Sequence, residues 1–181
     1  MKISLLGPES TGKSVLGKAL ADHYNGIYVP EYARTYTEQL DRDYTYDDVC
    51  RIVEEDRRQM QASYPADFVF FDAGLIVDKV WLDVVYGRRP EWLNEGGPED
   101  CQADFYLLTY PDIAWQADPT RENGSDDARL RLYQTYLHEI ILTGKPYGIV
   151  RGQGSARTAC AIRLIDNCLH RIKQLSPAER R

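Results

Sequence analysis

The sequence contains no long hydrophobic run. Nowhere among its 181 residues do about eighteen apolar residues follow one another, which is the length that a membrane-spanning helix requires. Met1-Lys2 leads directly into Ile3-Ser4-Leu5-Leu6-Gly7, which is too short for the apolar region of a signal peptide. We therefore expect no membrane insertion and a cytoplasmic protein whose mature N-terminus is Met1.

Paired cysteines and an excess of basic charge are also lacking. Cys50, Cys101, Cys160 and Cys168 show neither C-x-x-C spacing nor close pairing with the three histidines, which argues against a structural zinc site and favours reduced thiols. Twenty-eight acidic residues outweigh 22 basic ones, and the net charge of −6 has the wrong sign for a protein that grips a long phosphate backbone. We expect no nucleic-acid partner, although the charge is compatible with a small phosphorylated ligand.

The chain has little room for a second catalytic module. Its length corresponds to one domain, since domains contain roughly 100–200 residues, and we find neither an internal repeat nor a linker. A hydrophobic share of 43% and a charged share of 28% argue against disorder. The sequence therefore predicts one domain over residues 1–175, followed by a frayed tail at residues 176–181.

Short apolar runs alternate with helical patterns along the whole chain. Strands are predicted at residues 3–6, 27–29, 68–71, 105–108 and 148–150. Helices are predicted at residues 13–24, from a capping box at Thr45 and Asp48 to about residue 63, after Asp72, at 126–143 and from about 162 to 174. The helix after Asp72 carries Ile76, Val80, Trp81, Val84 and Val85 on its expected apolar side. This alternation predicts an α/β fold, a three-layer doubly wound parallel sheet of about five strands that binds ligands beyond the carboxyl ends of its strands.

One motif carries strong chemical information. Residues 7–14, Gly-Pro-Glu-Ser-Thr-Gly-Lys-Ser, fit G-x-x-x-x-G-K-[ST] between a predicted strand and a predicted helix, as in a P-loop. The predicted contacts to the phosphates of ATP come from Gly7, Glu9, Ser10, Thr11, Gly12, Lys13, Ser14 and Val15. The alternative interpretation is an ordinary turn with a surface lysine.

A magnesium ion is expected beside these phosphates. Ser14 offers a hydroxyl, and Asp72 at the end of a buried strand offers a carboxylate that holds the ion directly or through water. The alternative role of Asp72 is to cap the following helix.

The rest of the sequence discriminates among nucleotide enzymes. The guanine-reading N-K-x-D motif is absent, and on length alone a mechanical or AAA+ ATPase is not expected, because its lid domain and inter-subunit arginines require more chain. A small-molecule kinase needs only a lid and an acceptor pocket. The polar segment at residues 115–125 is predicted to be the lid, with Arg121 stabilising the transferred phosphoryl group and Arg129 and Arg131 as candidates to share that task. The alternative is a solvated loop with surface arginines.

Transfer to an alcohol also requires a carboxylate near the attacking hydroxyl. Glu31, just beyond the second strand, is the candidate general base, and Asp72 is the alternative. Glu31 would otherwise serve as a carboxylate at a helix N-terminus.

A flat heteroaromatic acceptor needs ring faces on which to stack. Candidate rings near the expected cleft belong to Tyr32, Trp81, Tyr86, Trp92 and Trp115. Trp81 has an alternative role in the core, because it lies on the apolar side of its predicted helix.

Several more specific segments occur together with the P-loop. In order they are Val-Pro-Glu-Tyr-Ala-Arg at 29–34, Lys-Val-Trp at 79–81, Leu-Leu-Thr-Tyr-Pro-Asp-Ile at 107–113 and Asp-Pro-Thr-Arg-Glu-Asn at 118–123. With them the chain resembles, over nearly its whole length, the ribosylnicotinamide kinase domain of NadR-type proteins. The resemblance implies a nucleoside-kinase-like fold and transfer of the γ-phosphate of ATP to the 5′-hydroxyl of nicotinamide riboside, giving nicotinamide mononucleotide in NAD salvage.

The resemblance also implies roles for individual residues. Lys13, Ser14 and Asp72 would handle the nucleotide and Mg²⁺, Glu31 and Arg34 would lie at the riboside, and Arg121 would belong to the lid. The catalytic set is therefore Lys13, Glu31, Asp72 and Arg121, and the substrate-binding set is Glu31, Tyr32, Arg34, Asp72, Trp81 and Trp115.

The chain departs from the family pattern after the strand-end aspartate, and Ala114 and Gly124 stand where the family pattern suggests proline. A hydroxyl residue and an acid usually follow the strand-end aspartate in that family, whereas Ala73 and Gly74 stand here, which leaves the acceptor open. The H-x-G-H motif of the nucleotidyltransferase domain that such proteins often carry is absent, as expected of a free-standing kinase module.

Two alternatives to nicotinamide riboside phosphorylation remain at this point. One is a kinase for another nucleoside, a nucleotide or a vitamin alcohol such as thiamine. The other is an ATP-binding regulatory partner with little turnover. The sequence is compatible with a homo-oligomer but does not determine the oligomeric state.

Overall fold

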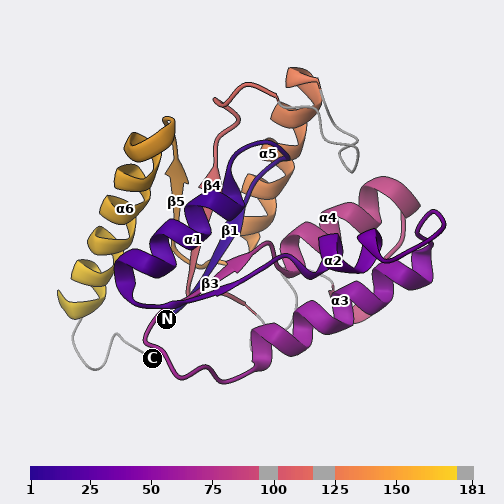
Figure 1. The fold of residues 1–181 in the computed structure, drawn as a ribbon, viewed down its shortest axis with the longest axis horizontal. Coiled ribbons are helices and arrows are strands. Elements are labelled where there is room, and N and C mark those ends of the chain that lie inside the picture. The colour runs from indigo at the N-terminus through magenta and orange to yellow at the C-terminus, as the bar shows by residue number, and fades with distance from the viewer. Residues whose placement is uncertain (94–101, 116–124, 175–181) are drawn as a thin grey trace.

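A five-stranded parallel sheet forms the centre of the molecule. The computed structural model describes residues 1–93, 102–115 and 125–174. Its strands are β1 (Lys2–Leu6), β2 (Ile27–Val29), β3 (Val69–Asp72), β4 (Phe105–Thr109) and β5 (Tyr147–Val150), in the order β2-β3-β1-β4-β5 (Figure 1). The predicted α/β fold and all five predicted strands are confirmed.

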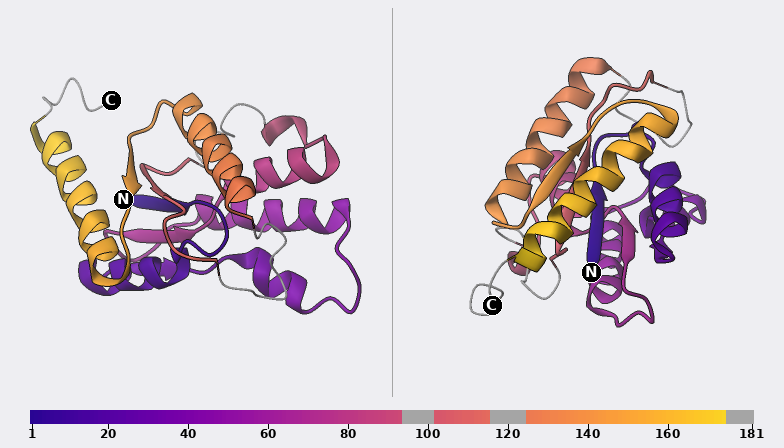
Figure 2. Two further views of the ribbon diagram at one scale, coloured as in Figure 1. Left: turned by 90° about the horizontal axis from the view of Figure 1, so that it is seen from above. Right: turned by 90° about the vertical axis from the view of Figure 1, so that its left-hand side faces the viewer.

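Helices cover both faces of this sheet. On one side lie α1 (Lys13–Tyr24) and α6 (Gly154–Gln174), and on the other lie α3 (Tyr46–Gln61), α4 (Leu75–Tyr86) and α5 (Asp126–Leu142), as Figures 1 and 2 show together. Two short elements were not predicted, namely α2 (Tyr32–Glu38) and the 3₁₀-helix η1 (Glu91–Leu93). In the described part of the chain, no helix is both long and apolar enough to span a membrane.

The core consists of two apolar layers separated by the sheet. Successive residues of a strand point to opposite faces. Accordingly Ile3 and Leu5 of β1 belong to the layer beneath α1 and α6, whereas Leu6 belongs to the layer beneath α3, α4 and α5. All three side chains are fully buried, as expected for a central parallel strand covered on both faces.

The start of α3 confirms the predicted capping box. The Asp48 amide donates to Thr45 Oγ1 over 3.4 Å, and the Thr45 amide donates to Asp48 Oδ2 over 2.8 Å. The guanidinium of Arg42 also binds this carboxylate, and these hydrogen bonds hold the pKa of Asp48 well below its ordinary value. The corner before α3 is therefore fixed by local polar contacts.

The apolar side of α4 differs from the prediction at its last turn. Val84 and Val85 are 66% and 45% exposed, whereas Leu82 is fully buried and Tyr86, four residues later, packs against the core. Because residues four apart share a helix face, this turn presents Leu82 and Tyr86 inward and both valines outward. The expectation that Val84 and Val85 lie on the apolar side was wrong.

Candidate active site

The loop between β1 and α1 lies at the carboxyl end of the central strand. Its backbone has φ of +144° at Gly7 and +74° at Gly12, a region that favours glycine. A Cβ atom at Gly7 would lie 2.1 Å from Oγ1 of Thr109, at the end of the neighbouring strand β4. Glycine at position 7 therefore lets the loop pack directly against β4.

Two buried hydroxyls fix the loop from beneath. Thr11 Oγ1 lies 2.8 Å from the Pro8 carbonyl and 2.7 Å from Thr109 Oγ1, which in turn donates to the Leu6 carbonyl over 3.0 Å. Both threonines are completely buried. The hydroxyls therefore connect the start of the loop, its middle and the end of β4.

A buried arginine binds the loop from the side. Arg129, in the first turn of α5, is 1% exposed and donates to the carbonyls of Glu9 (3.3 Å) and Ser10 (3.2 Å). It also donates to the carbonyl of Ile113 over 2.9 Å. We expected Arg129 to assist Arg121 in the lid, but the structure places its guanidinium against the backbone of the phosphate loop.

The beginning of α1 has the properties of an anion site. Gly12 occupies the N-cap position without a side-chain capping bond, and no acidic residue lies in the first turn. The amides there and the positive end of the helix dipole can therefore bind a phosphate. The Lys13 ammonium lies over the loop and donates to the carbonyls of Gly7 (2.8 Å) and Pro8 (3.1 Å). Ser14 and Val15 are exposed at the same helix end.

Asp72 ends β3 beside this loop and is 4% exposed. Its Oδ2 accepts a hydrogen bond of 2.7 Å from the hydroxyl of Tyr28. Its Oδ1 is buried and has no hydrogen-bond partner among the residues that the structure describes. A buried carboxylate oxygen of this kind is costly unless a ligand binds it, and oxygen is the ligand that Mg²⁺ prefers. Asp72 and the Ser14 hydroxyl therefore fit a magnesium ion bound beside the phosphates.

The phenol of Tyr28 reaches this region from β2. Burial first and the Asp72 carboxylate second raise the pKa of Tyr28 above its ordinary value, while a hydrogen bond with Ser14 acts in the opposite direction. The phenol is therefore protonated at neutral pH and acts as a donor to Asp72. No sequence motif indicated this residue.

Glu31 is the N-cap residue of α2 but makes no side-chain capping bond. Burial is the largest influence on its pKa, which is raised; Lys13 and Arg34 oppose the shift, and Asp72 adds to it. The carboxylate therefore lies within electrostatic range of the lysine and the aspartate at the phosphate site. This geometry does not support the alternative that Glu31 serves only its own helix.

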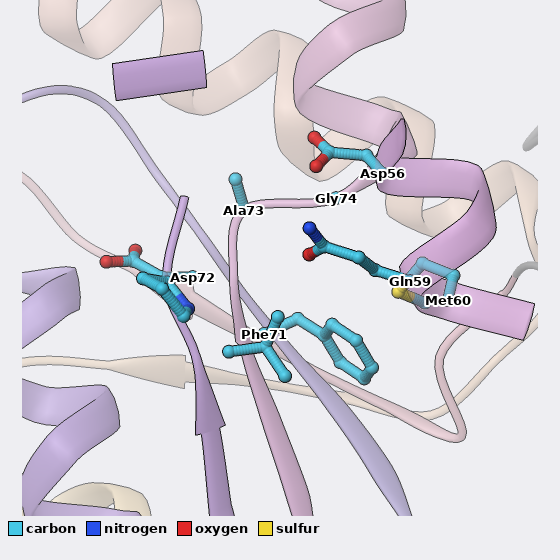
Figure 3. A pocket seen from close by; sticks show the side chains of 9 residues that line it. Asp56, Gln59, Met60, Phe71, Asp72, Ala73 and Gly74 are labelled. Carbon is cyan, nitrogen blue, oxygen red and sulfur yellow. The ribbon is translucent and has the colours of Figure 1, made fainter. Parts of the chain in front are cut away.

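A small pocket opens between the carboxyl ends of β2 and β3 and the helix α3 (Figure 3). It is lined by Val29, Pro30, Asp56, Gln59, Met60, Phe71, Asp72, Ala73 and Gly74. The carboxylate of Asp56 points from α3 toward the turn formed by Ala73 and Gly74, as Figure 3 shows. Asp56 thus brings an acid to the turn where the resemblance led us to expect one in sequence.

Asp56 forms a buried pair with Asp78 of α4. The two carboxyl groups are hydrogen-bonded, and burial raises the pKa of Asp56 to about 7 and that of Asp78 well above its ordinary value. Glu31 contributes to both shifts. Because two adjacent buried carboxylates cannot readily both ionise, the pair retains a proton at neutral pH.

The next residue, Lys79, points toward α5 and not toward the carboxyl pair. It is 3% exposed and forms an ion pair of 2.5 Å with Glu139 of α5, which is 9% exposed. This buried pair joins α4 to α5.

The predicted aromatic side chains make separate contacts. The rings of Tyr32 and Tyr36 lie 5.9 Å apart, and Trp81 donates its ring N–H to Tyr44 over 3.3 Å. Trp92 lies beneath the guanidinium of Arg57, at 4.8 Å. Tyr86 and Tyr46 are in edge contact, with their ring centroids 5.3 Å apart. None of these four predicted rings belongs to the residues that line the pocket in Figure 3.

Arg34, Trp115 and Arg121 are the remaining predicted site residues. Arg34 is exposed on α2, and Trp115 is partly exposed at the end of the described segment 102–115. Arg121 and most of the predicted lid lie outside the described residues, as does the predicted tail.

Sequence reasoning missed several residues at this site. The missed residues are Tyr28, Asp56, Asp78 and Thr109, and the position of Arg129 beside the phosphate loop was also not predicted. A signal existed for two of them: Arg129 is in register with buried Tyr133, Tyr136 and Ile140 on α5, and Asp56 with Val49, Ile52, Val53 and Met60 on α3. A charged residue in the apolar register of a helix needs a buried partner, so such a position suggests a site.

A comparison with protein-family models identifies the family to which this loop and sheet belong. A family model described as an AAA domain matches residues 2–157. The chain belongs to the AAA domain family. The length argument against AAA+ ATPases was therefore not a valid ground for excluding this family, because an AAA domain fits within the 181 residues. No curated protein matches the sequence significantly.

Solved structures similar to this AAA domain include small-molecule kinases. A NadR protein in complex with NR has a TM-score of 0.70 at 22% identity and covers 92% of this chain, which spans 50% of that protein. Deoxyadenosine kinase from M. mycoides has a TM-score of 0.57 at 15% identity, over 95% of this chain and 100% of that one. Shikimate kinase from Acinetobacter baumannii has a TM-score of 0.54 at 14% identity, over 97% of this chain and 95% of that one.

These similarities establish the fold. The AAA domain described here has a P-loop small-molecule-kinase-like fold, and its P-loop implies nucleotide binding. The chain spans about half the length of the NadR structures that it matches.

Proposed function

We propose that the protein is an ATP-dependent kinase that transfers the γ-phosphate of ATP to the 5′-hydroxyl of nicotinamide riboside, giving nicotinamide mononucleotide. The observation that carries the proposal is the position of Glu31, whose carboxylate lies within electrostatic range of Lys13 and Asp72 and also of the Asp56–Asp78 pair. Glu31 directly follows Val29 and Pro30, which line the pocket beside Asp72, and an acceptor hydroxyl bound there would meet the nucleotide.

The chain's own residues would divide the reaction as follows. Backbone amides of the loop and the Lys13 ammonium bind the phosphates, and Glu31 accepts the proton of the attacking hydroxyl. A bond forms between that hydroxyl oxygen and the γ-phosphorus as the bond to the bridging oxygen of ADP breaks. Mg²⁺, held by Ser14 and Asp72, would neutralise charge on the phosphates.

The charge of the pocket supports a cationic acceptor. Asp56 lines the pocket, Glu31 lies within electrostatic range of it, and the pyridinium ring of nicotinamide riboside carries a positive charge that would favour their ionised forms. Neutral nucleosides lack that attraction. In this proposal Tyr32, Arg34, Trp81 and Trp115 contact the riboside, and Arg121 closes over the phosphates.

An ADP-release assay with a panel of acceptors tests the proposal. The panel contains nicotinamide riboside, nicotinic acid riboside, adenosine, cytidine and thiamine, and mass spectrometry identifies the product. We expect the highest kcat/KM with nicotinamide riboside, and a lower value with nicotinic acid riboside because of its additional carboxylate. The absence of acceptor-dependent ADP release with every riboside would refute the proposal.

A kinase with another acceptor is the second candidate, and the turn after Asp72 favours it. Gly74 has φ of +137°, and a Cβ atom there would lie 3.1 Å from Ser4 Oγ, so the turn cannot readily carry the acid that the resemblance suggests. The same panel separates the two candidates. Tight ATP binding without any acceptor-dependent turnover would instead support a regulatory ATP-binding partner.

A further inference from the structure

We propose that Tyr28 is a positioning residue for the magnesium–nucleotide complex and acts by orienting the carboxylate of Asp72. The inference rests on the nucleotide-binding part of the proposed function but not on the identity of the acceptor. Tyr28 lies outside the P-loop, in the middle of the three-residue strand β2, so no nucleotide-binding motif includes it.

The phenol makes an asymmetric contact with Asp72. Its hydroxyl donates to Oδ2 over 2.7 Å, whereas Oδ1 is buried and has no hydrogen-bond partner in the described part of the chain. The hydrogen bond therefore engages one carboxylate oxygen and leaves the other for an external ligand. Ser14, the other side chain that fits the metal ion, lowers the pKa of Tyr28 and is therefore a near neighbour of the phenol.

The position of the ring is fixed by its neighbours. In the β2–β3 register Tyr28 lies opposite Phe70, two residues before Asp72, and the ring packs against the apolar layer beneath α1. On α1, Gly17 leaves room for it, because a Cβ atom at that position would lie 2.7 Å from the ring. The Lys18 ammonium lies 5.7 Å from the ring centroid on the same helix. The phenol is thus a rigid donor rather than a mobile surface group.

Orientation of a metal-binding carboxylate by such a partner has a measurable effect. Removal of an outer partner of a metal ligand commonly costs 10–100-fold in metal affinity. Without the phenol, the Asp72 carboxylate could rotate about its side-chain bonds and would no longer present Oδ1 in a single direction.

The experiment compares Tyr28→Phe with Tyr24→Phe. Tyr24 is a matched control, because its hydroxyl also donates to a carboxylate, Asp166 Oδ1 at 2.8 Å, and its ring packs in the same apolar layer. Binding of a fluorescent ATP analogue is titrated with MgCl₂ and repeated in EDTA, with no acceptor present. Thermal melting verifies that both variants are folded.

We expect the Mg²⁺ concentration for half-maximal enhancement of nucleotide binding to rise about tenfold in Tyr28→Phe and to stay unchanged in Tyr24→Phe. Binding in EDTA should be the same in both. The effect should vanish in an Asp72→Asn background, since there the carboxylate to be oriented is gone. An unchanged Mg²⁺ dependence in folded Tyr28→Phe would overturn the inference, as would an equal shift in Tyr24→Phe. Because the titration contains no acceptor, failure of the acceptor panel would leave this result interpretable.

Discussion

The two sides of the candidate active site satisfy their polar groups in different ways. On the phosphate side, Thr11, Thr109 and Arg129 are buried and bound to backbone carbonyls or to each other. On the acceptor side, Asp56 and Asp78 are buried against each other, and Asp78 Oδ2 has no hydrogen-bond partner among the described residues. The phosphate side is held by hydrogen bonds to backbone carbonyls, whereas the other side contains a buried carboxyl pair that retains a proton.

This difference shows where a ligand would contribute most. A loop held by internal hydrogen bonds needs little rearrangement to bind phosphate, so binding loses little conformational entropy. Buried carboxyl groups without full hydrogen bonding destabilise the protein until a ligand supplies hydroxyl donors or positive charge. The phosphate side is thus prearranged by its hydrogen bonds, whereas a bound ligand would contribute more to the side that contains the carboxyl pair.

The largest expected effect is on the phosphate side. Arg129→Ala leaves the carbonyls of Glu9, Ser10 and Ile113 without their donor, and we expect a loss of about 3 kcal/mol in the free energy of unfolding together with weaker ATP binding. Urea denaturation and nucleotide titration measure both. Arg131→Ala, an exposed position on the same helix, is the control, and similar losses in the two variants would contradict the assigned role.

Glu31→Gln tests whether Glu31 acts as the general base. We expect turnover to fall at least about a hundredfold while MgATP binding stays nearly intact, because the amide cannot accept the proton of the hydroxyl. In the wild type, the base must be ionised, so turnover should rise with pH through the raised pKa of Glu31, and the variant should lack that rise. Glu38→Gln, exposed at the end of α2, is the control. Equal activity of Glu31→Gln and the wild type would transfer the role to Asp72 or to positioning.

Asp78→Asn should produce the smallest effect and the opposite sign. Because the folded state raises the pKa of both partners, it binds their protons more tightly than the unfolded chain. Wild-type stability should therefore fall as pH rises from about 4, the ordinary carboxyl pKa, to about 7. The variant needs no proton at this position and should melt a few degrees above the wild type at pH 8, and at a similar temperature at pH 4.

Thermal melting from pH 4 to pH 8 measures this difference. Asp22→Asn, at an exposed position on α1, is the control and should follow the wild type. If the melting temperatures of Asp78→Asn and the wild type change in parallel with pH, the buried acid pair does not lower the stability of the protein at neutral pH.

Local patterns explain which parts of the fold and site could be predicted. The P-loop, the strand-end Asp72 and the Thr45 capping box each depend on neighbours within a few residues, and the predicted elements agree with the structure there. The contact between Tyr28 and Asp72 instead joins residues 44 positions apart, and it depends on the pairing of β2 with β3. The pairing of Asp56 with Asp78 likewise requires the packing of α3 on α4. No periodicity along a single segment contains that information.

Two buried polar side chains of α5 bind different parts of the molecule. Arg129 near its beginning holds the phosphate loop, and Glu139, ten residues later, is paired with Lys79, the neighbour of Asp78. At 1.5 Å per residue, about 15 Å of helix separates these two residues. The helix therefore sets the distance between the phosphate loop and α4, and an inserted or deleted residue between positions 129 and 139 would move and rotate one of them relative to the other.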